Sequence, residues 1–359
     1  MGPRTRKAHP TLMVHSLRRI LPWVLCLTAI GFVPAGFGGN AAAEPVRGVT
    51  ISTHTDGTDW AFDGTATTMK SIRDLGADWV AIHPYAGIRT DGAVRAWSLD
   101  PENPPEWIRR PIREAHALGL KILIKPHLAY WGTRFTWRGA ITFETEAEWD
   151  RFWSTYRRWI VDLARACRKA DGFVVGTELD RTIDQEGEWR ELIREVRAET
   201  GMPLTYAANW SDFEQVGFWD ALDVIGIQAY FPIVDSLTVD TGTDALREGW
   251  NATMGRLRAY AEQHNRKIIF TELGYNRSYE APVQPWAYRT DGRGAEKIQQ
   301  ACLRTALEAI EKEPDVLGAF LWKWFPEPHP VGRNFQLATP ELIRTIRSVW
   351  GPASRRTLH

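Results

Sequence analysis

Residues 107–125 read WIRRPIREAHALGLKILIK, and this stretch contains the unit that repeats along the chain. Its first part, from Trp107 to Leu118, carries apolar residues at helical spacing. Gly119 follows, where helices commonly end in a left-handed residue. The last part, Lys121–Lys125, is apolar throughout its interior, as a strand buried on both faces of a parallel sheet must be. The stretch therefore predicts a helix, a glycine cap and a buried strand.

The same alternation of strand and helix runs through the chain from residue 46 to residue 350. Strands are expected at Gly48–Ser52, Trp79–His83, Lys121–Lys125, Phe173–Thr177, Leu204–Ala208, Val224–Gln228, Ile268–Thr271 and Ala319–Trp322. Helices are expected at Thr65–Leu75, Trp107–Leu118, Glu146–Lys169, Glu188–Glu199, Asp244–His264, Gly294–Lys312 and Pro340–Val349, with a short one after Trp210. Eight such units are the number that closes a (β/α)₈ barrel, so we expect an α/β fold with a single TIM barrel over residues 44–359. An open doubly wound sheet is the alternative, but no glycine-rich phosphate loop follows the first strand.

Composition excludes several classes of protein. The 359 residues include 44 Lys and Arg and 44 Asp and Glu, so no basic field exists to bind nucleic acid. Three cysteines exclude a disulfide scaffold, and Cys167 and Cys302 fall in expected helices, where we expect buried thiols. No pair of histidines has metal-ligand spacing, so neither a metal nor another cofactor is expected.

The first 43 residues resemble an export signal. Five basic residues and no acidic one precede a mostly apolar run from Ile20 to Phe37, and the small residues Ala41–Ala43 follow. A basic start, a short apolar run and a small-residue cleavage site are the three parts of a secretory signal peptide. We therefore expect a secreted or periplasmic protein, with an uncleaved membrane anchor as the alternative. Cleavage after Ala43 would leave a net charge of −5.

Glutamates stand at the ends of two of the expected strands. Glu178 follows Phe173–Thr177, and Glu272 follows Ile268–Thr271. In a TIM barrel the chemistry lies at the carboxyl ends of the strands, and a carboxylate there is costly to bury unless a function requires it. Glycoside hydrolysis needs one carboxyl group to protonate the leaving oxygen and another to attack or assist at the anomeric carbon. The pair therefore indicates a glycosidase.

Glutamates at the ends of strands four and seven are also the mark of the retaining glycosidases of clan A. The motifs Gly176-Thr-Glu-Leu179, Leu204-Thr-Tyr-Ala-Ala-Asn-Trp210, Phe218–Pro232 and Phe270-Thr-Glu-Leu-Gly-Tyr275, taken in this order, resemble glycoside hydrolase family 113. The resemblance covers nearly all of residues 46–350. It implies an endo-acting β-1,4-mannanase in which Glu178 is the acid/base and Glu272 the nucleophile. Most of the clan has Asn where this chain has Thr177, so the contact of that Asn with the sugar 2-hydroxyl must be replaced or absent.

Other residues at the strand ends are candidates for binding the polysaccharide. An indole ring offers a flat face to the C–H groups of a sugar, and five tryptophans gather there. Tyr230 is placed to hydrogen-bond Glu272 and keep it ionised. The candidate substrate-binding residues are His83, Lys125, His127, Trp131, Asn209, Trp210, Tyr230, Trp322 and Trp324.

Each of these residues also has a structural interpretation, such as core packing for tryptophan or helix capping for Asn209. Two alternative functions likewise remain open. One is a non-catalytic barrel that binds polysaccharide, and the other is the same chemistry on a β-glucan or an envelope polysaccharide. The loops at residues 130–144 and 278–291 are long and contain aromatic residues, so we expect them to form subsite walls.

Overall fold

The computed structural model describes residues 45–97, 99–237, 242–326 and 335–351, and eight parallel strands in them close into a barrel. In chain order these strands are β1 (Val46–Ile51), β2 (Trp79–Ile82), β5 (Lys121–Ile124), β7 (Gly172–Thr177), β8 (Leu204–Asn209), β9 (Ile225–Gln228), β10 (Ile268–Leu273) and β11 (Val316–Trp324). Each pairs with the next, and β11 pairs with β1 to close the ring. All eight expected strands are present, which confirms the single TIM barrel.

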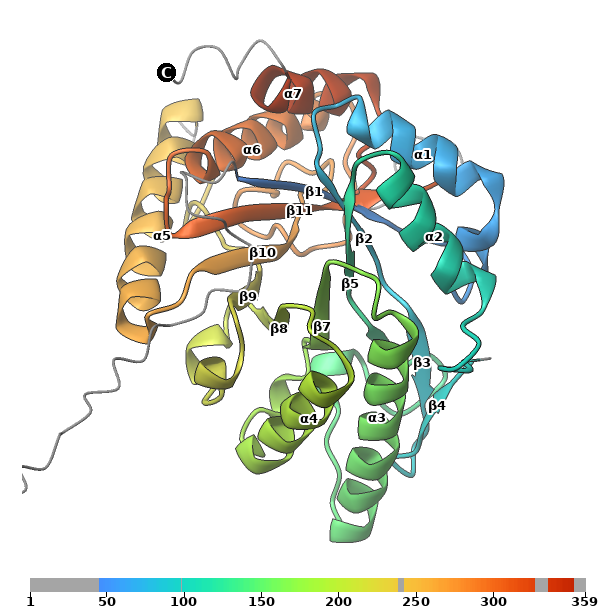
Figure 1. Ribbon diagram of the computed structural model, residues 1–359. Coiled ribbons are helices and arrows are strands. Elements are labelled where there is room, and N and C mark those ends of the chain that lie inside the picture. The colour runs from blue at the N-terminus through green and yellow to red at the C-terminus, as the bar shows by residue number, and fades with distance from the viewer. Residues whose placement is uncertain (1–44, 98, 238–241, 327–334, 352–359) are drawn as a thin grey trace, which may run out of the picture. The chain divides into compact units, whose positions relative to one another are not determined.

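Helices surround this barrel (Figure 1). They are α1 (Asp63–Arg73), α2 (Glu106–Ala117), α3 (Glu146–Ala166), α4 (Glu186–Glu199), α5 (Thr243–His264), α6 (Ala295–Ile310) and α7 (Pro340–Trp350). The short helix expected after Trp210 is a pair of 3₁₀ helices, Phe213–Gln215 and Trp219–Ala221, between β8 and β9. Gly119 has a φ of 74° after α2, in the left-handed region that glycine enters at little cost.

Local sequence explains where the longer helices begin. At the start of α3, the Thr145 hydroxyl accepts a hydrogen bond from the Glu148 backbone N–H, and the Glu148 carboxylate accepts one from the Thr145 N–H. This reciprocal pair is a capping box, which satisfies two backbone donors that the first turn leaves unpaired. At α7, Thr339 caps the helix and Pro340 occupies its first position, where the missing N–H is not needed.

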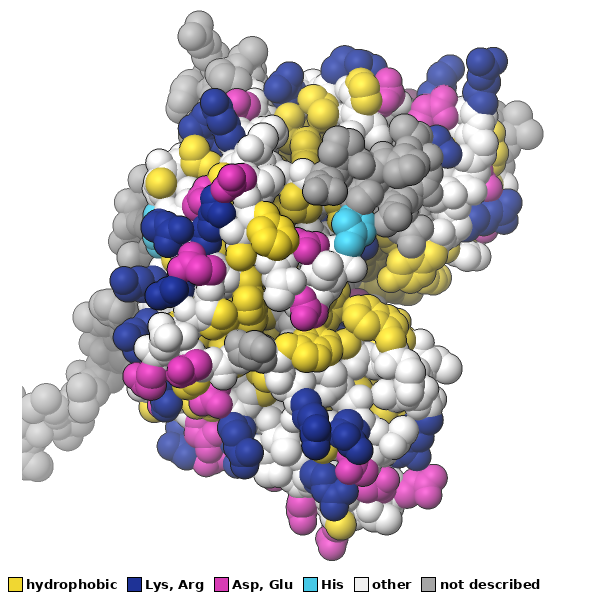
Figure 2. Space-filling view, turned by 90° about the vertical axis from the view of Figure 1, so that its right-hand side faces the viewer, with side chains coloured by type: hydrophobic (Ala, Val, Ile, Leu, Met, Phe, Trp, Pro, Cys, Tyr) yellow, Lys and Arg dark blue, Asp and Glu magenta, His cyan; other side chains and the backbone are white. Residues whose placement is uncertain are grey.

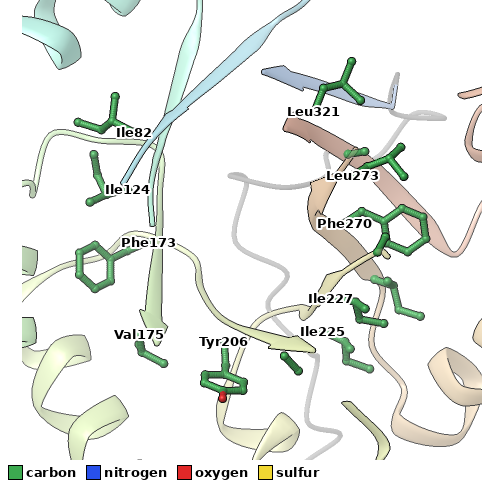
Figure 3. Packing of buried hydrophobic residues seen from close by; sticks show 14 of the residues in the cluster. Ile82, Ile124, Phe173, Val175, Tyr206, Ile225, Ile227, Phe270, Leu273 and Leu321 are labelled. Carbon is green, nitrogen blue, oxygen red and sulfur yellow. The ribbon is translucent and has the colours of Figure 1, made fainter. Parts of the chain in front are cut away.

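The core has two layers because side chains alternate along each strand. One set points away from the barrel axis and packs under the helices; Figure 3 shows Ile124, Phe173 and Phe270 among them. The alternate set packs inside the barrel and includes Val174 and Ile269. With both faces buried, the barrel is a rigid frame for the groups at its carboxyl end.

A second, three-stranded sheet lies beyond β2 and β5, and its existence is not predictable from the strand pattern. It consists of β3 (Tyr85–Ile88), β4 (Val94–Ala96) and β6 (His127–Ala129) in the order β4-β3-β6. Pro84 and Pro126 separate β3 and β6 from the barrel strands that precede them. In the parallel pair, Tyr85 lies opposite His127, so the small sheet brings these two side chains to the same place.

Two further expectations concern cysteines and membranes. Cys167 and Cys302 are buried free thiols, as expected. The export signal and the alternative membrane anchor lie in residues 1–44, outside the described part of the chain. No helix among the described residues is long and apolar enough to cross a membrane.

Candidate active site

A cavity of about 570 Å³ opens at the carboxyl ends of the barrel strands, and both glutamates line it. Six of the residues expected to bind substrate also line it, namely His127, Trp131, Asn209, Trp210, Tyr230 and Trp322. Tyr85 of β3 and Lys323 of β11 also line it, and the remaining lining residues come from loops, namely Tyr130, Trp137, Arg138, Ser211, Trp286, Ala287, Tyr288 and Phe335. Figure 2 shows a face of the molecule on which hydrophobic side chains gather near the middle, with acidic side chains among them and most Lys and Arg towards the margin.

Glu272 is the more buried of the two carboxylates, at 4% exposed, and two groups bind it. The Lys125 ammonium donates to its Oε1, and the Tyr230 hydroxyl donates to its Oε2 at 2.7 Å. Burial alone raises the pKa of Glu272, but the charge and hydrogen bond of Lys125, with the Tyr230 hydrogen bond, outweigh it and hold the pKa below its usual value. Glu272 is therefore ionised near neutral pH and held in one orientation.

Glu178 is held differently, by its backbone. Its φ is 50°, in the left-handed region that a non-glycine residue occupies at a cost of about 1–3 kcal/mol. The Glu178 N–H donates to the Ala207 carbonyl at 2.9 Å, and the next N–H, of Leu179, donates to the Tyr206 hydroxyl at 2.8 Å. These contacts with β8 fix the turn that directs Glu178 into the cavity.

Arg138 is the ionic partner of Glu178. Its Nη1 lies 2.7 Å from Glu178 Oε2, and both side chains are 15% exposed. It comes from a 3₁₀ helix, Arg138–Ala140, in the loop that follows β6. Among the described residues Arg138 donates to Glu178 alone, and its buried Nε has no partner. The remaining nitrogen, Nη2, donates to no described residue and is not among the buried unpaired atoms, so it is the donor available to a ligand.

A third carboxyl group lies beside Glu178. Burial, together with the charges of Glu178 and Asp212, raises the pKa of Asp180 to about 7. The Asn209 side-chain amide donates to Asp180 Oδ2 at 3.4 Å, a long hydrogen bond that lowers this pKa somewhat. The contact ties Asn209 to the segment that carries Glu178.

The two histidines of the mouth are neutral. Burial first, and the charges of Lys125 and Arg138 next, lower the pKa of His83 and of His127 well below the usual value. His83 is fully buried, contacts Ser52 Oγ at 3.1 Å and does not line the cavity. His127 does line it, and neither of its ring nitrogens has a hydrogen-bond partner among the described residues.

The tryptophans divide between cavity and core. Trp322 lines the cavity, while Trp324 packs in the hydrophobic core away from it, although residues two apart on a regular strand share a face. Trp210 stacks on Trp286, with ring centroids 5.1 Å apart and planes 18° apart. Trp131 is 63% exposed at the cavity edge. Lys125, His83 and Trp324 are therefore the expected substrate contacts that the structure does not place on the cavity wall.

Comparison with known proteins decides the family. The model of glycoside hydrolase family 113 matches residues 49–333 of the chain. The chain belongs to glycoside hydrolase family 113. It is therefore a glycoside hydrolase, and its substrate is a polysaccharide or an oligosaccharide.

Solved structures agree with this family. A family 113 β-mannanase from Alicyclobacillus acidocaldarius, in complex with ManMIm, superposes with a TM-score of 0.75 at 25% identity and covers 88% of this chain and 99% of its own. A family 113 β-1,4-mannanase has a TM-score of 0.72 at 23% identity, with coverage of 86% and 99%. A β-glucuronidase from Ruminococcus gnavus, at 12% identity and a TM-score of 0.57, shares the fold over half of its length. No curated protein sequence matches this chain.

This family 113 enzyme departs from the clan at Thr177, and the structure shows where that side chain goes. The Thr177 hydroxyl donates to the Pro126 carbonyl at 3.0 Å, and the residue is 2% exposed and does not line the cavity. Its proton is therefore already used within the protein.

Sequence reasoning missed several residues of this cavity. Arg138, Trp286 and Tyr288 lie in loops, where no periodicity restricts the direction of a side chain. For Trp286 and Tyr288 the available signal was the aromatic content of residues 278–291, which were expected to form a subsite wall. Arg138 lies in residues 130–144, the other expected subsite wall, but nothing in the sequence pattern distinguishes it from Arg134 of the same loop.

Proposed function

We propose that this enzyme is an endo-acting β-1,4-mannanase that cleaves with retention of configuration, with Glu272 as nucleophile and Glu178 as acid/base. The observation that carries the proposal is the unequal environment of two carboxyl groups in one cavity. Lys125 and Tyr230 keep Glu272 ionised and oriented, which a nucleophile requires. Glu178 has one ionic partner, on Oε2, and its Oε1 accepts no hydrogen bond from the described residues. That oxygen is available to carry a proton to the substrate.

The reaction then takes two steps. In the first, a Glu272 oxygen bonds to the anomeric carbon, the bond from that carbon to the leaving oxygen breaks, and the Glu178 proton passes to this oxygen. In the second, water attacks the anomeric carbon, Glu178 takes the water proton, and the bond to Glu272 breaks. Each step inverts the carbon once, so the product keeps the β configuration.

Mannan as substrate is supported by the family and by the aromatic walls. The two solved relatives above are described as a β-mannanase and a β-1,4-mannanase. Trp322 in the cavity, Trp131 at its edge and the Trp210–Trp286 stack offer flat apolar faces to sugar rings. We also propose that the chain is exported, as its first 43 residues indicate.

The test uses purified enzyme and a panel of polysaccharides: glucomannan, galactomannan, unsubstituted β-1,4-mannan, cellulose and a mixed-linkage β-glucan. We expect reducing ends from the mannans, with a fall in viscosity that precedes most of the sugar release, because an endo-acting enzyme cuts inside the chain. Proton NMR should show the β-anomer of the new reducing end first, before mutarotation. Binding to mannan without any release would favour the non-catalytic barrel, and release from the β-glucans alone would move the same chemistry to another substrate. Glu272→Ala is the control for contaminating activity.

A further inference from the structure

The stereochemistry of a β-mannoside places a demand on the acid/base side of this cavity. In a β-mannoside the 2-hydroxyl is axial and projects from the same face of the ring as the leaving oxygen. The nucleophile attacks from the opposite face. Retaining glycosidases gain stabilisation from hydrogen bonds to the 2-hydroxyl that strengthen in the transition state. For mannose, a donor for that hydroxyl must therefore lie beside the acid/base, which is assigned above to Glu178.

Few polar groups of the described residues meet this requirement. The Thr177 hydroxyl donates to the Pro126 carbonyl and is excluded from the cavity wall. Asn209 lines the cavity, and its amide donates one of its two N–H groups to Asp180 at 3.4 Å, so it remains a neutral candidate donor. Lys125 and Tyr230 donate to Glu272, and His127 Nε2 lies 3.6 Å from Glu272 Oε1, so these three residues belong to the opposite side of the reacting carbon.

Arg138 meets the requirement on three counts. It lines the cavity, it binds Glu178 and not Glu272, and donors of its guanidinium have no partner among the described residues. The planar guanidinium can hold the carboxylate through one nitrogen and a hydroxyl through another. A hydrogen bond from a charged donor is also stronger than one from a neutral amide.

We propose that Arg138 donates a hydrogen bond to the axial 2-hydroxyl of the sugar whose glycosidic bond is cleaved, and so makes the enzyme select mannose over glucose at this position. In a β-glucoside the 2-hydroxyl is equatorial and points away from the face of the leaving oxygen, so Arg138 would lose this partner. A cationic donor left unpaired in a closed site is costly, which is how such sites reject the wrong epimer. The inference rests on the function proposed above.

The experiment removes the protein group and the substrate group separately and together. The substrates are 2,4-dinitrophenyl β-mannobioside and its analogue that lacks the 2-hydroxyl on the sugar bearing the phenol. An acidic phenol needs little help from a general acid, so changes at Glu178 affect the rates weakly. In wild-type enzyme we expect kcat/KM to fall about 10- to 100-fold when the 2-hydroxyl is removed. In Arg138→Met the ratio of kcat/KM for the full substrate to kcat/KM for the 2-deoxy analogue should shrink to within about threefold, because the partner of the hydroxyl is gone.

Two variants serve as controls. Arg134→Met makes the same change in an exposed arginine of the same loop, outside the cavity, and should leave both rates unchanged. Asn209→Ala removes the other candidate donor and should keep the wild-type dependence on the 2-hydroxyl. If Arg138→Met does not fold, as judged by thermal unfolding, Arg138→Lys retains the charge without the planar fork and should show an intermediate ratio.

The outcomes separate this inference from the proposed function. An unchanged ratio in the Arg138 variants, or a ratio lost only in Asn209→Ala, would overturn the role of Arg138 and leave the β-mannanase proposal standing. Failure of the wild-type enzyme to cleave either glycoside or any mannan would overturn both. If kcat/KM loses its dependence on the 2-hydroxyl in Arg138→Met and keeps it in Arg134→Met and Asn209→Ala, the assignment is supported.

Discussion

The two carboxylates of the cavity are held by different means, although both follow apolar strands of the same barrel. Glu272 is held by its side chain, through Lys125 and Tyr230. Glu178 is held by its backbone, through a positive φ and hydrogen bonds to β8, and its carboxyl group has a single ionic partner. A fixed, ionised group suits attack on carbon, while a group with one oxygen left open suits the gain and loss of a proton. The difference therefore supports the proposed roles without reference to any ligand.

Replacing Glu272 should have the largest effect. Without the nucleophile no covalent intermediate forms, whatever the leaving group is. We expect Glu272→Ala to lose at least about 10⁴-fold in kcat on mannan and on aryl mannosides alike. Single-turnover assays with both substrate types measure this loss. Substantial activity of the variant on either substrate would contradict the assignment.

Replacing Glu178 should have a smaller effect that depends on the substrate. General acid catalysis contributes about 10²- to 10⁴-fold, and only where the leaving oxygen needs a proton. Glu178→Ala should lose activity by that amount on mannan, yet still release an acidic phenol in a rapid first turnover, followed by slow hydrolysis of the intermediate. Stopped-flow detection of the phenol shows whether this burst occurs. Equal losses of activity on mannan and on the aryl mannoside would contradict the role of Glu178 as acid/base.

Tyr230→Phe weakens the holding of Glu272 without removing the nucleophile. Loss of a hydrogen bond to a charged group should lower kcat/KM about 10- to 100-fold. Because Tyr230 helps to hold the pKa of Glu272 below its usual value, its removal raises that pKa. The nucleophile must be ionised, so the acidic limb of the kcat/KM profile should move to higher pH while the basic limb stays. A profile with no change in the acidic limb would mean that Tyr230 does not control the ionisation of Glu272.

The smallest change in activity distinguishes the two tryptophans of β11. Trp322→Ala removes part of the cavity wall and should lower kcat/KM on mannan by about 10-fold with little change in stability. The magnitude is taken from the stacking of a nucleic-acid base on an aromatic side chain, which contributes ~1–3 kcal/mol. Trp324→Ala empties a core position and should lower the free energy of unfolding by about 3–5 kcal/mol. Denaturant unfolding and mannan kinetics on both variants test this, with Trp159→Phe as the core control. Loss of stability in Trp322→Ala and loss of activity alone in Trp324→Ala would contradict this division between cavity and core.

The extent to which the sequence predicts this molecule depends on which part of it is considered. The barrel strands are apolar on both faces, so their pattern is unambiguous, and glycines such as Gly119 end helices where the chain must turn. β3, β4 and β6 escape prediction because each has three or four residues with at most one β-branched residue among them, whereas the equally short β2, β5 and β9 have two each.

The same distinction holds for the site. Glu178, Glu272 and Tyr230 are predictable because strand ends of a barrel must converge. Arg138 is not, because its position depends on the fold of a loop that no residue pattern specifies. The surroundings of Glu272 are therefore the more predictable ones, whereas the ionic partner of Glu178 requires the structure.

The assignment of roles is tested most directly by azide rescue of the two alanine variants, with 2,4-dinitrophenyl β-mannobioside as substrate. In Glu178→Ala, azide fills the space of the acid/base and attacks the covalent intermediate, so the product should be the β-glycosyl azide. In Glu272→Ala, azide replaces the nucleophile and attacks the substrate itself from the opposite face, which gives the α-glycosyl azide. Proton NMR of the isolated azides distinguishes the anomers. A β-azide from Glu178→Ala and an α-azide from Glu272→Ala are the predicted result, and the reverse pair would contradict the account.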